Sequence, residues 1–332
     1  MQRTFFCVDG HTAGGPVRLV AAGAPVLRGS TMSERRQDFL ARFDWIRRSL
    51  MFEPRGHDAM SGGFIFPPLT DDTDAALLFL ETSGCLPMCG HGAIGLVTLG
   101  LEHGLITPAE RGRLRLEVPA GRIEIEYEDD GRTVTSVSIR NVPSFVSKRG
   151  LVVQVPNLGE ISLDVAYGGN FYAIIEPQGG YRGVDDLGAA GILALSPVVR
   201  RLVGEIYEPV HPHDPTIRGV SHVMWADPLT AGERARSAVF YGDHAIDRSP
   251  CGTGTSARLA QLIASGRHPA GLPLEHESFI RSRFTARSAG EAMVGEHSAI
   301  LPVITGAAVA TGINILTVDE DRDPLWRGFQ VV

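Results

Sequence analysis

Cysteine is scarce in this chain of 332 residues, which has only Cys7, Cys85, Cys89 and Cys251. Four cysteines are too few for the disulfide scaffold of a secreted protein of this size. We therefore expect buried or catalytic thiols in a reducing compartment, the cytoplasm. The first residues also lack the apolar core and cleavage site of a signal peptide. The uncharged run 299–316 contains a proline, two glycines and an asparagine, which favours strands and a turn over a membrane span.

Charge of one sign is not concentrated anywhere in the sequence. The formal net charge is -7, from 31 Lys and Arg against 38 Asp and Glu, and the basic residues are scattered. This distribution argues against nucleic acid as a partner. The composition, 43% hydrophobic and 21% charged, is typical of a globular protein with a sizeable core. The length allows two domains of ordinary size.

Two turns that contain cysteine are the most informative stretches of the sequence. Residues 86–95 include Cys89, residues 248–257 include Cys251, and each turn has a proline before its cysteine. In each, small residues and then an apolar helix follow the cysteine. The first N–H groups of a helix have no partner within the helix, so they hold an anion such as a carboxylate and favour the ionised form of a neighbouring thiol. Two such turns in one chain predict a pair of thiols that face one small anionic substrate.

The first half of the chain predicts strands around an apolar helix. A capping box at Thr31 and Glu34 predicts a helix that runs to about Leu50. Residues 75–80 are expected to form a buried strand. The stretch 93–105 is apolar on nearly every face, which is typical of a buried helix. Alternating apolar residues over 113–142 predict a meander of antiparallel strands.

The second half repeats this order of elements. A strand is expected up to Glu176, then a helix near 185–203, two further strands, and a helix over 253–265. The spacing from His11 to Cys89 is close to the spacing from Tyr167 to Cys251, which indicates a duplication.

We therefore predict an α+β fold with two pseudo-symmetric domains, each with antiparallel strands wrapped round a central helix. The predicted domains are 1–135, joined by returning strands from about 310–332, and 136–309. Similar domains would place the two cysteine turns across one cleft, where ligand sites tend to lie.

Paired thiols suit one reaction in particular. Acid and base groups on opposite faces of a carbon can remove a proton from one side and return it to the other, which inverts a stereocentre. The α-proton of an amino acid is weakly acidic, so N–H donors must hold the carboxylate and stabilise the developing charge. This chemistry needs no metal and no pyridoxal phosphate, so we expect no cofactor.

The sequence resembles the proline racemase family, whose fold is that of diaminopimelate epimerase. The shared motifs lie at 11–18, 88–92, 167–171 and 247–255, and the resemblance covers essentially the whole chain. It implies epimerisation of 4-hydroxyproline at carbon 2, with Cys89 and Cys251 as the proton-transfer residues. The substrate-binding residues that it implies are Gly90, His91, Gly252 and Thr253 for the carboxylate, and His222 and Asp247 for the ring amine. Where relatives often have a polar residue, this chain has Gly15.

Branches of the family differ at a few positions. The 3-hydroxyproline dehydratases have threonine in place of the second cysteine, so Cys251 disfavours dehydration. Proline racemases line the ring pocket with phenylalanine, whereas Ser61, Ser221 and Tyr241 are polar here. Hydrogen-bonding groups discriminate strongly against a ligand that lacks the matching hydroxyl. We therefore expect hydroxyproline in preference to proline.

Several alternatives stay open. Proline racemase and 3-hydroxyproline dehydratase activity are the nearest alternative functions, and a non-catalytic binder of a cyclic amino acid is another.

Cys7 and Cys85 are expected to be structural. A zinc site from Cys85, Cys89, His91 and Cys251 lacks the usual ligand spacing. The expected partner is a small-molecule substrate, hydroxyproline, with no nucleic acid and no membrane, in a monomer or homodimer.

Overall fold

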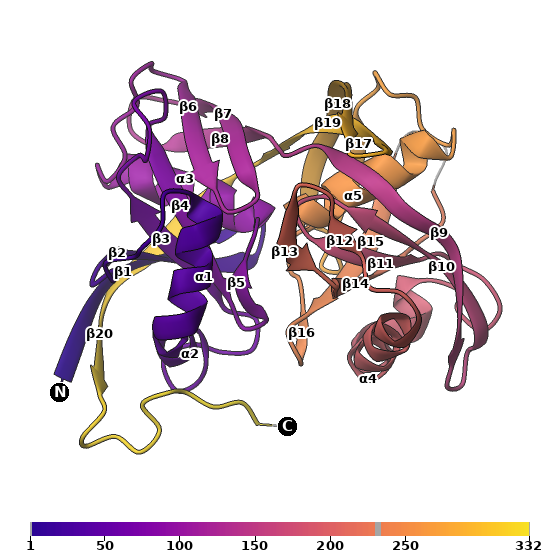
Figure 1. Cartoon of the computed structure of the whole chain (residues 1–332), viewed down its shortest axis with the longest axis horizontal. Helices are drawn as coiled ribbons and strands as arrows, with labels where there is room; N and C mark the ends of the chain where they lie inside the picture. Colours follow the sequence, from indigo (N-terminus) through magenta and orange to yellow (C-terminus); the bar gives the residue numbers. More distant parts are fainter. Residues whose placement is uncertain (1, 230–233, 332) are drawn as a thin grey trace. The chain divides into compact units, whose positions relative to one another are not determined.

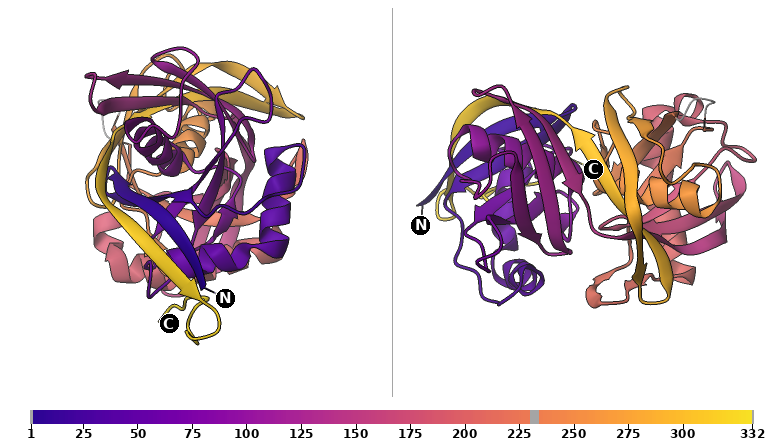
Figure 2. Two further views of the ribbon diagram at one scale, coloured as in Figure 1. Left: turned by 90° about the vertical axis from the view of Figure 1, so that its left-hand side faces the viewer. Right: turned by 90° about the horizontal axis from the view of Figure 1, so that it is seen from above.

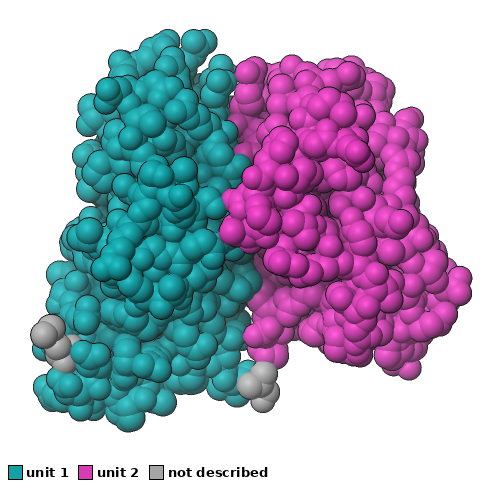
Figure 3. Space-filling model, in the orientation of Figure 1, with its two compact units in different colours: residues 1–139, 306–332 teal, residues 140–305 magenta. Residues whose placement is uncertain are grey.

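The computed structural model describes residues 2–229 and 234–331. The chain forms two compact units (Figures 1 and 3). Unit 1 is Met1–Ile139 together with Gly306–Val332, and unit 2 is Arg140–Thr305. The C-terminal segment therefore returns to the N-terminal unit.

Unit 1 is built of strands around one buried helix. Its elements are β1 (Gln2–Thr12), β2 (Gly15–Ala22), α1 (Met32–Arg42), α2 (Asp44–Met51), β3 (Ser61–Phe66), β4 (Ala75–Glu81), β5 (Gly84–Leu86), α3 (Gly90–Glu102), β6 (Arg113–Val118), β7 (Gly121–Asp129), β8 (Val134–Arg140) and β20 (Ala308–Asp319). Helix α3 is buried on every face from Gly90 to Gly100 and contacts β1, β2, β3, β4 and β20. In the left-hand view of Figure 2 it is seen nearly end-on, enclosed by strands. This confirms the expected central helix, which begins and ends three residues earlier than predicted.

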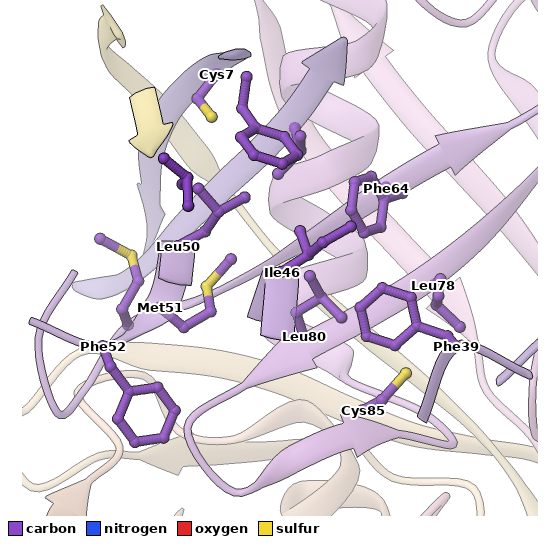
Figure 4. Close-up of a cluster of buried hydrophobic side chains, with 14 of the residues drawn as sticks. Cys7, Phe39, Ile46, Leu50, Met51, Phe52, Phe64, Leu78, Leu80 and Cys85 are labelled. Carbon is purple, nitrogen blue, oxygen red and sulfur yellow. The ribbon is translucent and has the colours of Figure 1, made fainter. Parts of the chain in front are cut away.

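Helices α1 and α2 cover an apolar cluster beside β3 and β4. Phe39, Leu50 and Phe64 are fully buried in this cluster (Figure 4). The predicted capping box is confirmed, because the Thr31 side chain accepts from the Glu34 N–H and the Glu34 side chain reaches back to the cap. The single helix expected up to Leu50 is wrong. The chain breaks at Phe43, which is the C-cap of α1 and the N-cap of α2. The bend lets both short helices turn apolar side chains to the same cluster.

Unit 2 repeats the plan. Its elements are β9 (Ser144–Val155), β10 (Gly159–Tyr167), β11 (Phe171–Ile175), α4 (Val184–Ile206), β12 (Val210–His211), β13 (Asp214–Arg218), β14 (Val220–Ala226), β15 (Arg234–Tyr241), β16 (Ala245–Ile246), α5 (Gly252–Ala264), β17 (Leu274–Glu277), β18 (Arg283–Val294) and β19 (His297–Gly306). Helix α5 is the buried helix here, and it contacts β9, β10, β11 and β18.

Strand pairing shows that the two units are pseudo-symmetric. In unit 1, β2 and β3 run parallel, β3 and β4 antiparallel, β4 and β5 antiparallel, and β4 and β6 parallel. In unit 2, β11 and β14, β14 and β15, β15 and β16, and β15 and β17 pair in the same four senses. Strand β20 pairs antiparallel with β1 as β9 does with β10. The predicted α+β fold with two similar halves is confirmed.

Two adjacent glycines allow close strand packing in unit 1. Gly62 and Gly63 lie inside β3, and a Cβ on either would meet a backbone oxygen of a neighbouring strand at 2.2 Å. These glycines therefore allow close approach of β3 to β2 and β4. The strand expected up to Glu176 is β11, which begins at Phe171 after the turn that follows β10.

Helix α4 is the one helix among the described residues that is long and apolar enough, by length and composition alone, to cross a membrane. Its backbone is non-helical at Gly188, and Pro197 lies within it. It packs on β9, β14 and β15. The expected helix near 185–203 is thus present, with a kink.

Candidate active site

Cys89 caps the N-terminus of α3 and is only 3% exposed. Its Sγ lies 3.6 Å from Nδ1 of His91 and 3.9 Å from Oγ of Ser61. The backbone carbonyl of His91 accepts a hydrogen bond from the Thr12 hydroxyl at 2.8 Å, which ties the helix start to β1. Gly90 is the first residue of α3. Unit 1 therefore brings together four residues that the sequence analysis named: Ser61, Cys89, Gly90 and His91.

A buried carboxylate, which the sequence analysis did not identify, lies beside Cys89. Glu81 ends β4 and is 3% exposed. The Cys89 thiol donates to its Oε1 at 3.6 Å, and the Ser83 hydroxyl donates to its Oε2 at 2.8 Å. The available signal was a single acidic residue directly after a fully apolar strand.

Cys251 caps α5 in unit 2, and its backbone is strained. Its φ of 64° and ψ of 98° lie outside the conformations that ordinary L-residues prefer, whereas Cys89 has an extended backbone. Such a conformation costs about 1–3 kcal/mol and persists where the surroundings enforce it. Strain of this kind clusters at functional sites.

The turn before Cys251 is held by a ladder of hydrogen bonds. Oδ1 of Asp247 accepts from the Ser249 N–H at 2.8 Å, and the Ser249 hydroxyl accepts from the Cys251 N–H at 3.1 Å. Asp247, which was expected to contact a ring amine, is seen here to hold the backbone turn that leads to Cys251.

The surroundings of Cys251 are hydroxyls and stacked rings. The Tyr172 hydroxyl lies 3.3 Å from the Cys251 Sγ and 2.6 Å from the Thr253 Oγ1. The Tyr172 ring stacks on His222 with centroids 4.7 Å apart, and His222 stacks on Tyr241 at 6.3 Å. Tyr172 was also missed by the sequence analysis, although it directly follows the motif at 167–171.

The Ser221 hydroxyl is engaged with its own neighbours. It lies 2.7 Å from Nδ1 of His222 and donates to the Phe171 carbonyl at 3.4 Å. Ser221 is therefore placed to fix the ring of His222.

A buried histidine contacts α5 through the side chain of Thr255. His276 on β17 has Nδ1 2.7 Å from the Thr255 hydroxyl and Nε2 3.0 Å from the Ser237 hydroxyl. The Thr255 hydroxyl in turn donates to the Pro250 carbonyl at 3.2 Å. Since Thr255 has one proton to give, Nδ1–H of His276 is the donor to it. Burial, with a smaller contribution from the Arg258 charge, lowers the pKa of His276 to about 3, so the ring is neutral.

The remaining two cysteines lie in the apolar core of unit 1. Cys7 and Cys85 are buried, and all four cysteines are free. Burial raises the pKa of each of these two thiols to about 12. Because the thiolate is the reactive form, this supports the structural role expected for both.

In each unit, a thiol that can transfer a proton lies next to a helix start that can bind an anion. A thiol stands at the start of a buried helix, where the first N–H groups and the helix dipole attract a carboxylate. Gly90 and Gly252 open the two helices, followed by His91 and Thr253.

Comparisons with known proteins agree with these features. The model of the proline racemase family matches residues 7–330. The chain is 54% identical over 333 residues to the 4-hydroxyproline 2-epimerase of Shewanella loihica, with 100% of both proteins covered. It is 55% identical to the 4-hydroxyproline epimerase of Brucella ovis, with 99% of both covered. The crystal structure of a hydroxyproline epimerase from Agrobacterium vitis with bound trans-4-hydroxy-L-proline matches with a TM-score of 0.91 at 30% identity, covering 99% of this chain and 96% of that one.

The family model spans nearly the whole sequence, and the relatives match it from end to end. This chain, with its two cysteine-capped buried helices, therefore belongs to the proline racemase family.

Proposed function

We propose that this protein interconverts trans-4-hydroxy-L-proline and cis-4-hydroxy-D-proline without a cofactor. The observation that carries the proposal is the pair of cysteine-capped buried helices, in a chain whose relatives at 54–55% identity are named for this reaction. A binder of the same amino acid would need the helix starts for its carboxylate but no thiol beside either of them.

In the proposed mechanism, one proton leaves the α-carbon and another proton is added to its opposite face. The N–H groups at the helix starts, with His91 and Thr253, hold the substrate carboxylate and stabilise the negative charge that develops when the α-proton leaves. One cysteine, as thiolate, takes that proton. The other, as thiol, gives a proton to the opposite face, and the roles of Cys89 and Cys251 swap with the direction of reaction.

The neighbours of each thiol have assigned roles in this proposal. His222 and Asp247 contact the ring amine. Ser61 and Tyr241 receive the ring hydroxyl, and Ser221 keeps the His222 ring in place, because its own hydroxyl already contacts that ring. We place the reaction in the cytoplasm, because both thiols must stay reduced.

The test compares the wild type with three cysteine variants. Cys89→Ser and Cys251→Ser should each abolish epimerisation, because a serine hydroxyl is far too weak an acid to replace a thiol. Each single variant should still exchange the α-proton of one enantiomer with deuterium from solvent, since one base survives. Cys85→Ser is the matched control, and it should retain activity. Near-normal epimerisation by either active-site variant would contradict the two-thiol mechanism.

The same assay tests the substrate, with trans-4-hydroxy-L-proline, trans-3-hydroxy-L-proline and L-proline. Proline would leave a buried hydroxyl of the protein without its partner, at a cost of about 1–3 kcal/mol. Such a cost corresponds to roughly a ten- to hundredfold preference in kcat/KM for 4-hydroxyproline. Equal efficiency on L-proline would return the chain to the proline racemases, and loss of water from the 3-hydroxy substrate would indicate a dehydratase.

A further inference from the structure

Glu81, Cys89 and His91 form a compact group of metal-ligating side chains within unit 1. Their ligand atoms all lie within 4.8 Å of one another, and all three residues are buried. The group spans the end of β4 and the start of α3, elements joined by the short hairpin to β5. Its geometry is therefore fixed by local structure.

The two distances from the Cys89 sulfur match those around a tetrahedral ion. Zn–S bonds are about 2.3 Å long, and Zn–N and Zn–O bonds are about 2.0–2.1 Å long. In tetrahedral geometry, a nitrogen or oxygen ligand therefore lies about 3.6 Å from a sulfur ligand of the same ion. The Cys89 Sγ lies 3.6 Å from Nδ1 of His91 and 3.6 Å from Oε1 of Glu81. The Cys89 thiol is therefore at bonding separation from both neighbours for an ion shared with either of them.

Charge also balances in this group. A thiolate and a carboxylate together neutralise a divalent cation, which removes the main cost of burying one. Thiolate and imidazole favour borderline-soft ions such as Zn²⁺ and Co²⁺ over Mg²⁺ and Ca²⁺, which prefer oxygen ligands. Cys251, by contrast, lies close to the hydroxyls of Tyr172 and Thr253. Among the described residues, no second group of this kind occurs.

We propose that Glu81, Cys89 and His91 are a three-ligand site for a borderline-soft divalent cation, and that its occupation reversibly blocks the enzyme. Binding replaces the thiol proton: the Cys89 S–H bond breaks, a sulfur–metal bond forms, and one proton goes to solvent. The sulfur lone pair that would accept the substrate α-proton is then engaged by the ion. This blocking role rests on the proposed function, whereas ion binding does not.

The binding test uses Co²⁺ as the probe on the full-length, reduced, chelator-treated protein. We expect a near-ultraviolet thiolate-to-cobalt band and the visible bands of tetrahedral cobalt, saturating at one ion per chain, and loss of both when Zn²⁺ is added. Cys89→Ser should lose the thiolate band. Glu81→Gln, which keeps the shape of the side chain, should weaken binding about tenfold or more. Cys251→Ser is the matched control and should bind as the wild type does.

The blocking test measures epimerisation with added Zn²⁺ and then with EDTA. Inhibition that follows the occupancy measured with Co²⁺, and recovery with EDTA, would support the proposal. Absence of the thiolate band at one equivalent, or a band that survives Cys89→Ser, would overturn the site. Binding without inhibition would overturn the blocking role. A protein that binds Co²⁺ but has no epimerase activity without metal would overturn the proposed function and leave the site standing.

Discussion

Gly92 and Gly254 lie directly beneath the two cysteine side chains. A Cβ on Gly92 would stand 2.9 Å from the Cys89 Sγ, and a Cβ on Gly254 would stand 3.1 Å from the Cys251 Sγ. The glycine three residues after each cysteine is therefore what lets the thiol fold back over the first turn of its helix. This gives a physical reason for the repeated pattern of cysteine, glycine, any residue and glycine.

Gly92→Ala is expected to impair catalysis without unfolding the protein. The added methyl group must displace the thiol, and a reacting group misplaced by 1 Å costs up to about a hundredfold in rate, so kcat should fall about ten- to a hundredfold. Gly204→Ala in α4 is the matched control, because its Cβ would meet nothing within 4 Å. That control should keep full activity and gain roughly 0.5–1 kcal/mol of stability. Steady-state kinetics and urea unfolding measure both, and an unchanged kcat in Gly92→Ala would contradict this role for the glycine.

Residues near the cysteines were named from local motifs, distant residues such as His222 only through the family resemblance, and Glu81 and Tyr172 not at all. Local motifs whose residue types directly indicate their chemistry contain Cys89, His91, Cys251 and Thr253. Glu81 reaches Cys89 because β4 and β5 form a hairpin that folds back onto the helix start. Tyr172 and Cys251 are 79 positions apart. Contacts of this kind depend on pairing that a local pattern does not encode.

At the scale of elements, the spacing of apolar residues predicted whether a segment is a helix or a strand better than it predicted where the segment begins and ends. The apolar runs gave β4 and both central helices, and the capping box gave the start of α1. The break at Phe43 was missed because the apolar spacing continues through it, and the fold decides where the chain bends. Gly62 and Gly63 look like a turn in sequence, yet they serve close packing between strands.

The link between β15, β17 and α5 through His276 predicts a pH dependence of stability. The unfolded chain binds a proton on this histidine below about pH 6.5, whereas the folded protein, in which the pKa of His276 is about 3, does not. The unfolded state therefore binds more protons between these values, and folding stability rises with pH in this window. Acidification from pH 7 to pH 5 should cost about 2 kcal/mol through this residue alone.

Comparison of the wild type with His276→Gln isolates this contribution. The variant is expected to be less stable at pH 7, but its free energy of unfolding should change by about 2 kcal/mol less between pH 7 and pH 5. Urea unfolding at the two pH values gives the difference. Equal pH dependence in both proteins would show that His276 does not stay neutral in the folded state.

At the scale of the whole molecule, unit 1 depends on residues from both ends of the chain. Strand β20 pairs with β1 from Gln2↔Asp319 to Thr12↔Ala308. Beyond it, the Ser49 hydroxyl donates to the Trp326 carbonyl at 2.7 Å, and the Trp326 ring lies edge-on to Trp45 at 5.6 Å. Unit 2 contains its corresponding strand, β9, within its own continuous segment.

Deletion of residues 306–332 should therefore act on one unit. Without β20, the β1 edge loses its partner, and the apolar cluster under α1 and α2 loses the cover of Leu316, Val318 and Trp326. Hydrogen exchange should become fast across residues 2–139 and stay slow in α5 and the strands of unit 2. A shorter deletion of 320–332, which keeps β20, is the control and should leave β1 protected while loosening α2. Uniform loss of protection across both units after the longer deletion would show that unit 2 does not hold its structure independently.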